Sequence, residues 1–385
     1  MKTKFLFLLF LVIQQSFSQN RLEGIVLDKE TKKPIEYVDI YNDKDYTSSN
    51  EEGKFLFVSN GDSLNIGILG YEQIFSTFEL QKNDTILLKK KIQNLDKVVI
   101  NSDSNLFKSV LKKLDENYPL TPYKEKFFLR SVLKLNDKII KLVDFSGKVE
   151  RKTLFSTKSN PMPKKNYFIE IDNLRKAGIK EENIDFTLSS FEELFNNFIT
   201  IYMSPEIYDF KYIPFEDSRF VKLEFQPNSE KKANSSGYYL VNLDDKAFNE
   251  VHISNSQNTD YNEKGDIKYR TTNYSVNITF KKDPNVKKYF IDKATMSATV
   301  EVVPKNAEKI IYTVSYKLFT FDNFRNFEIN SNINLSKDIF RLKEDYNQSF
   351  WESQNYLLLT KEMQEFLNSL NNENNDFKSA TNIKS

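Results

Sequence analysis

Between residues 20 and 100, apolar and polar residues alternate in short runs that are separated by turn residues. The alternating runs predict strands over residues 22–27, 37–41, 54–58, 63–69, 73–78 and 85–88. Short strands of this kind, with a turn every ~8–12 residues, are typical of an all-β sandwich. Gly53 and Gly70 lie in intervening turns, where glycine adopts a positive φ without a clash at Cβ. Residues 20–100 are therefore predicted to form a β-sandwich domain.

A helical pattern follows the polar break at residues 101–104. Apolar residues then recur at helical spacing and form one stripe, with Leu106, Phe107, Val110, Leu111 and Leu114 as its members. Ser104 can cap this helix, which is predicted over residues 105–117 and ends at Asn117-Tyr118-Pro119. Residues 101–122 are therefore interpreted as a helical linker between two domains.

Residues 123–370 are predicted to form a larger β-rich domain. Its strands are predicted over 127–135, 138–150, 220–225, 238–243, 248–253, 274–280, 288–291, 297–303, 309–321 and 327–333. The segments 238–247 and 289–294 each place Asp-Lys-Ala between two β-rich runs, which predicts hairpin turns. Consecutive hairpins imply an antiparallel sheet with one buried face. If this sheet curls around its helices, it forms a half-barrel with an apolar concave face.

A few accessory helices are predicted within this domain. Ser190 and Glu193 have the spacing of a capping box, and an apolar face follows them. A second short helix is predicted over 171–177, where Gly178 stops it, and a last one over 361–370 after Thr360. The single Trp, Trp351, is expected to pack a terminal element onto the core. Residues 371–385 are Asn-rich and without periodicity, so a disordered tail is predicted.

The first 18 residues have the pattern of an export signal. Lys2 and Lys4 precede an apolar run over residues 5–13, and Ser16 and Ser18 fit a cleavage site before Gln19. A transmembrane anchor would need about 20 apolar residues, and no later stretch is apolar enough to span a bilayer as a helix. No Cys follows the run, so a lipid-anchored lipoprotein is excluded. The mature chain is expected in the periplasm or at the outer membrane, with the cell surface also open.

Composition removes several classes of function. Lys and Arg number 55 against 54 Asp and Glu, so no basic surface for nucleic acid is expected. The absence of Cys removes disulfides, thiolate metal sites and cysteine nucleophiles. The single His, His252, cannot build a His-rich zinc site. Alternation within 248–253 places His252 on the face opposite Val251 and Ile253, toward solvent. The alternative is that it acts as a lone ligand or general base.

The predicted sandwich resembles the carboxypeptidase regulatory-like domain. The resemblance is carried by Gly24-Ile25-Val26, Asp28, Thr31, Pro34-Ile35, Val38, Ile40, the segment 47–53 with Phe55, and Leu64, Ile66 and Leu69-Gly70-Tyr71. It implies a transthyretin-like sandwich of the kind found with Ton-dependent outer-membrane receptors and in other envelope proteins. The helix over 105–117, with Tyr123, Phe127-Phe128 and Arg130-Ser131, is also similar to envelope proteins that begin with this domain.

The resemblance implies no peptidase activity. The zinc site of such a peptidase needs two His and a Glu, with a further Glu as base, and a chain with only His252 cannot supply it. The remainder of the chain is also too short for the plug and large barrel of a receptor.

No other pattern predicts a catalytic, cofactor-binding or metal-binding residue. Adjacent carboxylates occur at Glu181-Glu182, Glu192-Glu193 and Asp244-Asp245, but helix starts and turns favour acids for local reasons. A glycosidase needs two carboxyls about 5–10 Å apart across a sugar cleft, which adjacency does not provide. Neither a Gly-rich phosphate loop nor a Gly-x-Ser-x-Gly elbow is present in the sequence.

The leading hypothesis is a non-enzymatic exported envelope protein that binds or scaffolds a partner protein or a ligand. An exposed edge strand could recruit a strand of the partner. One alternative is a carrier of lipid or lipoprotein that uses the concave face, since a curved sheet crossed by helices is similar to the half-barrels of envelope lipoprotein carriers. The other alternative is a carboxylate-based hydrolase of polysaccharide or ester.

Overall fold

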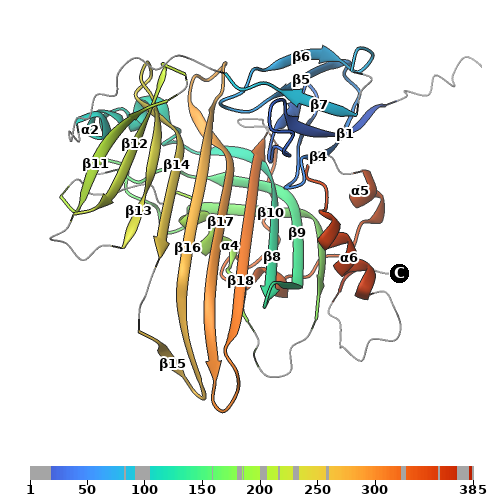
Figure 1. Ribbon diagram of the computed structural model, residues 1–385, viewed down its shortest axis with the longest axis vertical. Coiled ribbons are helices and arrows are strands. Elements are labelled where there is room, and N and C mark those ends of the chain that lie inside the picture. The colour runs from blue at the N-terminus through green and yellow to red at the C-terminus, as the bar shows by residue number, and fades with distance from the viewer. Residues whose placement is uncertain are drawn as a thin grey trace, which may run out of the picture. The chain divides into compact units, whose positions relative to one another are not determined.

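The computed structural model describes residues 19–81, 84–91, 105–157, 159–179, 184, 186–199, 206–215, 217–228, 234–256, 260–321, 327–353, 356–370 and 381–383. The predicted export signal and the polar break at 101–104 lie outside these residues. The chain divides into two compact units, one of residues 1–91 with 352–360 and the other of residues 92–351 with 361–385. Strands predominate in both units, so the predicted mainly β class is confirmed (Figure 1).

The first unit is a sandwich of two sheets. One sheet has the order β4-β1-β7, formed by β1 (Asn20–Asp28), β4 (Lys54–Ser59) and β7 (Thr85–Leu88). The other has the order β3-β2-β5-β6, formed by β2 (Asp39–Tyr41), β3 (Tyr46–Ser48), β5 (Ser63–Gly67) and β6 (Ile74–Thr77). The predicted strands are confirmed. The additional strand β3 was not predicted, because its three residues, Tyr-Thr-Ser, show no apolar alternation. The apolar core between the sheets includes Val26, Val38, Phe55 and Ile66, all 0% exposed.

The Asp28 carboxylate connects residues that carry the resemblance to the carboxypeptidase regulatory-like domain, namely Thr31 and Tyr71. Its carboxylate accepts hydrogen bonds from the backbone N–H of Thr31 at 2.7 Å and of Glu30 at 3.0 Å, and from the Tyr71 hydroxyl at 2.9 Å. The Thr31 backbone bond is the largest cause that lowers the pKa of Asp28, to about 2. The turn after β1 is therefore fixed by an ionised carboxylate that also ties it to Tyr71.

A late segment of the chain completes the edge of this unit at β3. Ser48 pairs with Leu357 in a parallel bridge, and the Ser48 N–H donates to the Tyr356 carbonyl at 3.1 Å. The Asn50 side chain donates to the Leu359 carbonyl at 3.4 Å, and Leu357 is fully buried. The outer edge of β3 is thereby covered.

The second unit is built on one antiparallel sheet of 11 strands in the order β10-β9-β8-β18-β17-β16-β14-β13-β12-β11, with β15 paired to β16 (Figure 1). The strands are β8 (Tyr123–Leu135), β9 (Lys138–Arg151), β10 (Tyr167–Gly178), β11 (Tyr208–Pro214), β12 (Phe220–Pro227), β13 (Ser235–Asn242), β14 (Ala247–Ser256), β15 (Asn262–Lys264), β16 (Ile267–Lys282), β17 (Tyr289–Pro304) and β18 (Ile310–Phe321). Neighbours along this path pair antiparallel. The predicted antiparallel sheet is confirmed.

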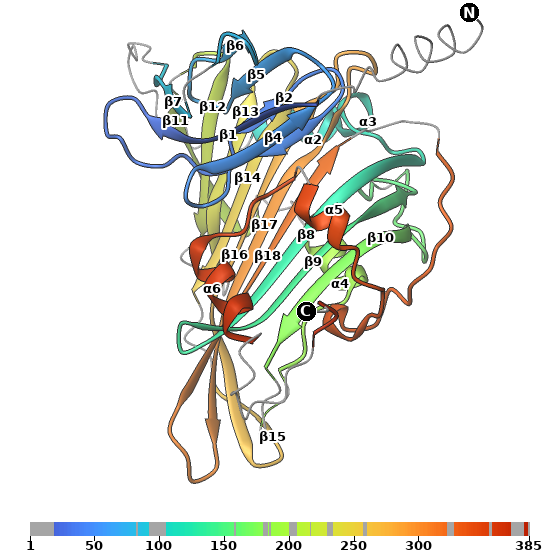
Figure 2. The ribbon, with the colours of Figure 1, turned by 90° about the vertical axis from the view of Figure 1, so that its right-hand side faces the viewer.

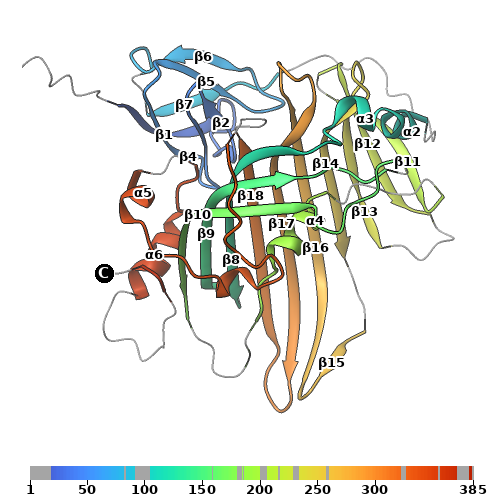
Figure 3. The same ribbon diagram turned by 180° about the vertical axis from the view of Figure 1, so that it is seen from behind.

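The sheet is open and curved, and short helices lie on both of its faces. On the concave side lie α2 (Asn105–Lys112), α3 (Leu114–Asn117) and α4 (Phe191–Asn197), with α4 inside the curve of the sheet (Figure 3). On the convex side, α6 (Lys361–Leu370) packs against β9, with α5 (Gln348–Ser353) before it (Figure 2). The predicted helix over 105–117 is confirmed as two helices that break at Lys113, and the helix over 361–370 is confirmed.

The capping box predicted at Ser190 is also confirmed. The Ser190 hydroxyl accepts from the Glu193 N–H at 3.2 Å, and the Glu193 carboxylate accepts from the Ser190 N–H at 2.8 Å. Two of the unpaired N–H groups at the start of α4 are thereby satisfied. The signal was readable in sequence because it depends on only four consecutive residues.

Two predictions in the larger unit are wrong because β-bulges interrupt the alternation. Residues 171–177 form part of β10, not a helix, because the register shifts between Ile171 and Asn173. The extra residue brings Ile171 and Leu174 to the same face, and their spacing imitates a helix. Asp292 lies inside β17 at a second shift in register, so the predicted turn at 292–294 is a bulge within one long strand. The hairpin turn at 243–246 is confirmed.

Residues 327–333 do not form the predicted strand. Their Asn332 side chain donates to the Ile171 carbonyl and accepts from the Ile171 N–H, both at 2.9 Å. The Asn382 side chain bonds β10 in the same way, at the Lys176 N–H and the Leu174 carbonyl, 2.8 Å each. Most of the predicted tail lies outside the described residues, but 381–383 are described and lie along β10. Side-chain amides thus satisfy the edge of this sheet.

Candidate functional site

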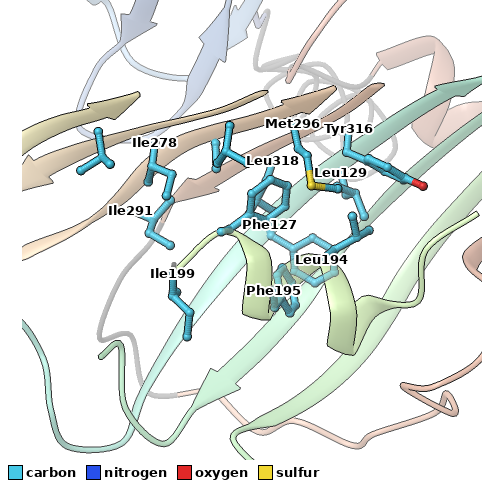
Figure 4. Close-up of a cluster of buried hydrophobic side chains, with 14 of the residues drawn as sticks. Phe127, Leu129, Leu194, Phe195, Ile199, Ile278, Ile291, Met296, Tyr316 and Leu318 are labelled. Carbon is cyan, nitrogen blue, oxygen red and sulfur yellow. The ribbon is translucent and has the colours of Figure 1, made fainter. Parts of the chain in front are cut away.

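The concave face of the large sheet is the principal candidate site, because apolar side chains cover it continuously from β10 to β11. Alternation directs one residue in two to this face, interrupted only at the bulges. Residues that lie at the centre of the face are labelled in Figure 4: Phe127, Leu129, Leu194, Phe195, Ile199, Ile278, Ile291, Met296, Tyr316 and Leu318. They come from the strands, from α4 and, for Ile199, from the turn after α4, so the helix and the sheet share one core.

The helix α4 presents aromatic rings to β8, β9 and β10. The Phe191 ring lies 5.1 Å from that of Phe145 and 5.8 Å from that of Phe127. The Phe195 ring lies 5.4 Å from that of Tyr167. Edge-on and tilted contacts of this kind are favourable beyond the area they bury. The helix has only seven residues, so its position depends on this packing.

The helix α2 covers the other end of the concave face. The ring of its Phe107 lies 5.0 Å from those of Phe210 and Tyr239 and 5.9 Å from that of Phe248. Just after α3, the Tyr118 hydroxyl accepts from the Phe248 N–H at 2.7 Å. The segment from α2 to Tyr118 is thereby fixed to strands β11, β13 and β14.

A cleft of about 600 Å³ opens beside α4. Its described lining consists of Thr187, Leu188, Ser189, Glu193, Asn196 and Asn197. Behind the lining, the Asn197 amide lies 3.7 Å from the Met296 sulfur, and the Ser189 N–H donates to the Tyr316 hydroxyl at 2.9 Å. The cleft therefore has a polar rim and lies next to the apolar centre of the concave face.

An ion pair is buried on the same face beneath α4. Arg151 Nε donates to Glu125 Oε1 at 2.6 Å, and both side chains are 0% exposed. Burial raises the pKa of Glu125, against the opposing charge of Arg151. Burial alone would lower the pKa of Arg151, but the charge and hydrogen bond of Glu125 together with Tyr123 and Tyr167 outweigh it, and the pKa is raised. Burial therefore opposes the charge on both side chains, and their mutual attraction offsets part of that cost.

A second ionic cluster lies on the convex face and is covered by Trp351 and Met363. Arg130 donates to Asp144 from Nε at 2.8 Å and from Nη2 at 3.1 Å. Arg175 donates to the same carboxylate from Nε at 3.2 Å, and the Trp351 ring lies 4.5 Å from its guanidinium carbon. Neither cluster was predicted, because each joins residues of separate strands whose register the sequence does not display.

Two of the adjacent carboxylates have structural roles. Glu193 completes the capping box, and Asp245 accepts from the Tyr289 hydroxyl at 2.6 Å and from Lys282 at 2.7 Å. Glu181 and Glu182 lie outside the described residues. His252 lies opposite Val251 and Ile253, as predicted, with its ring 5.3 Å from that of Tyr238. Burial lowers the pKa of His252.

The described residues contain no group of three or more His, Asp or Glu side chains placed to hold a metal ion. None of the helices in the described part of the chain has the length and apolar character that a membrane span requires.

Comparison with known proteins does not assign the chain to a family. No protein-family model matches it, and no curated protein matches it. Among solved structures it is similar to lipovitellin, in which lipid–protein interactions are described, with 10% identity, 57% of this chain covered and a TM-score of 0.22. The chain spans 27% of the length of that protein.

Two bacterial structures are similar over somewhat more than half of the chain. A LolA superfamily protein from Nitrosomonas europaea has 10% identity over 57% of this chain and 94% of its own, with a TM-score of 0.21. The MucA/MucB complex of Pseudomonas aeruginosa has 8% identity over 54% of this chain and 92% of the matched chain, with a TM-score of 0.18. Likenesses at these TM-scores establish neither a family nor a function.

Proposed function

We propose that the chain is a non-enzymatic exported binding protein whose larger unit binds an apolar or amphipathic ligand, such as a lipid, on the concave side of its sheet. The observation that carries the proposal is a continuous apolar face that short helices cover in place of a second sheet, with a polar-rimmed cleft of about 600 Å³ beside it at α4. Ligand pockets are commonly about 300–1,000 Å³ in volume.

The covering helices suit a ligand that takes their place. A helix as short as α4 has little stability of its own, so the packing of its apolar side chains decides where it lies. An acyl chain offers the same kind of surface to Phe127, Phe145 and Met296 and can replace those contacts. The sandwich, on its resemblance to the carboxypeptidase regulatory-like domain, would serve as an interaction or spacing module in the envelope.

The proposal predicts saturable binding of a neutral fluorescent probe, N-phenyl-1-naphthylamine, to the chain purified from Gln19 onward. Asn197→Trp fills the cleft and is expected to weaken binding by about tenfold. A tenfold loss of affinity corresponds to the free energy of burying part of one apolar side chain. Glu192→Trp adds the same ring on the exposed side of α4 and is the matched control, with unchanged affinity expected. Lipid that co-purifies with the chain is measured by mass spectrometry of an organic extract. Probe binding that is absent, or equally strong in both variants, would contradict the proposal.

A second candidate function, scaffolding of a partner protein, is favoured by the edge strand β6. Its residues are uncharged, and Phe75 in the strand and Leu80 just after it are 73% and 77% exposed. Three of the other edges carry protection: the segment 356–357 covers β3, Asn332 and Asn382 bond β10, and β11 carries Asp209, Lys211 and Pro214. A bare, uncharged edge accepts an extended strand of a partner through main-chain hydrogen bonds.

This second candidate predicts that Phe75→Lys abolishes capture of a stoichiometric envelope partner in a pull-down. Phe168→Lys replaces another exposed phenylalanine, in the larger unit, and should leave capture unchanged. Light scattering of the purified chain tests whether a second copy of the chain, and not a partner protein, pairs with β6. A dimer that Phe75→Lys dissolves would assign the edge to a second copy of the chain and refute the partner strand.

A further inference from the structure

Arg151 differs from the other cations of the concave face in its hydrogen bonding. Lys141 donates to the Phe186 carbonyl at 2.8 Å, and Lys176 donates to the carbonyls of Phe340 and Leu342 at 3.0 and 2.6 Å. Arg151 uses only Nε, toward Glu125, whereas Nη1 and Nη2 have no acceptor among the described residues. Buried guanidinium nitrogens are rarely left in that state, because each has lost its bonds to water.

The surroundings of Arg151 are those of a receptor for an amphipathic molecule. Its guanidinium carbon lies 4.6 Å from the centre of the Phe195 ring and 5.5 Å from that of Tyr167. The Tyr167 hydroxyl donates to Asn196 Oδ1 at 3.0 Å, and Asn196 lines the cleft beside α4. Arg151 is thus linked to the cleft through one ring and one amide.

We propose that Arg151 binds the acidic headgroup of the ligand, a carboxylate or phosphate carried on an apolar chain, through Nη1 and Nη2. The planar guanidinium presents two parallel N–H groups that match the two oxygens of such an anion. Glu125 holds the guanidinium in place from the Nε side. This inference rests on the proposed function and narrows its ligand class from apolar molecules in general to acidic amphiphiles.

The presence of Glu125 is compatible with a second acid at the same arginine. Burial raises the pKa of Glu125, so a proton on this carboxyl relieves the repulsion when an anion arrives. On the convex face Asp144 lies between Arg130 and Arg175 and accepts hydrogen bonds from both. The guanidinium nitrogens that have no acceptor among the described residues are those of Arg151, on the apolar concave face.

The test compares oleate with oleyl alcohol, which has the same chain and no charge, as competitors of N-phenyl-1-naphthylamine. The wild-type chain is expected to bind oleate about tenfold or more tightly than the alcohol, the scale of a charge-assisted bidentate pair. The double variant Glu125→Gln, Arg151→Gln avoids an unpaired buried charge and should bind both competitors with the affinity of the alcohol. Lys148→Gln removes a charge from the convex side of the same strand and should keep the preference.

Each outcome separates this inference from the proposed function. Equal affinity of the wild-type chain for oleate and the alcohol, or a preference that survives in the double variant, refutes the role of Arg151 and leaves the concave site standing. Displacement by neither competitor refutes the concave site itself. Displacement by free acetate or inorganic phosphate at similar concentrations would assign Arg151 to a free anion and not to an amphiphile. The wild-type preference needs no variant, so the test holds even where the double variant does not fold.

Discussion

Replacing Asp144 by Ala is expected to lower the free energy of unfolding of the larger unit by about 3–5 kcal/mol. Asp144 and Arg130 are 0% exposed and Arg175 is 7% exposed, so the substitution removes from a buried site the carboxylate that both arginines bond. Trp351 reports on the change, because its ring lies against Arg175 and it is the single Trp of the chain. Denaturant unfolding followed by its fluorescence measures the loss.

Acid should remove the same contribution in the wild-type chain. Burial alone would raise the pKa of Asp144, but the charges of Arg130 and Arg175 outweigh it and the pKa is lowered. A carboxyl whose folded pKa lies below its unfolded value, about 3.9, stabilises the fold above that pH and loses this effect as the pH falls through the folded pKa. The variant should therefore lose less stability than the wild-type chain when the pH falls below about 4.

Asp172→Ala is the matched control for Asp144→Ala. Asp172 bonds Lys148 at 3.0 Å on the surface of β10, where an exposed ion pair contributes about 0–1 kcal/mol. If Asp144→Ala destabilises the unit no more than this control, water or a rearranged side chain must satisfy the two arginines, and the buried cluster would not hold the convex face together.

The sequence contained one signal for this cluster that periodicity reasoning does not use. Arg130 stands in the run Phe127-Phe128-Leu129-Arg130-Ser131-Val132, where apolar residues occupy both faces of the predicted strand. A strand that is buried on both faces buries its arginine too, and a buried arginine requires an acid nearby. The identity of that acid depends on the register of β8 against β9, which no local pattern encodes.

Local patterns were informative where a structure depends on neighbouring residues. The strands of the sandwich and the capping box of α4 were predicted correctly, because alternation and an N-cap involve residues within one turn or one strand. The segment 171–177 was misread because a single extra residue at Asp172 changes a period of two into a spacing of three. A bulge is set by the partner strand, so one strand read alone cannot reveal it.

The candidate site was predictable only in outline. An apolar concave face followed from the antiparallel hairpins, and its helical cover followed from the stripe at Leu106 to Leu114 and the face of α4. Which side chains fill it, and that Glu125 and Arg151 lie buried beneath α4, depend on three strands meeting in one register. Long-range contacts of this kind are fixed by the whole sheet.

Replacing Phe107 by Ala is expected to destabilise the larger unit by about 3–5 kcal/mol, the range for removing a fully buried aromatic ring. Phe107 is 1% exposed and touches the rings of Phe210, Tyr239 and Phe248, so its removal leaves a cavity between α2 and the sheet. Hydrogen exchange should show lost protection in β11 and β13 first, because α2 covers those strands. Lys108→Ala changes an exposed residue of the same helix and should alter stability by no more than about 0.5 kcal/mol.

The size of this loss also bears on how the concave face takes up a ligand. A loss of several kcal/mol restricted to the Phe107 variant means that α2 is a fixed part of the core, so a ligand must enter beside α4, where the cleft lies. A loss below about 1 kcal/mol would contradict the expected cavity term and mean that α2 leaves the sheet easily. In that case the rings of Phe210, Tyr239 and Phe248 would be the first apolar surface available to a ligand, and Asn197→Trp would have little effect on probe binding.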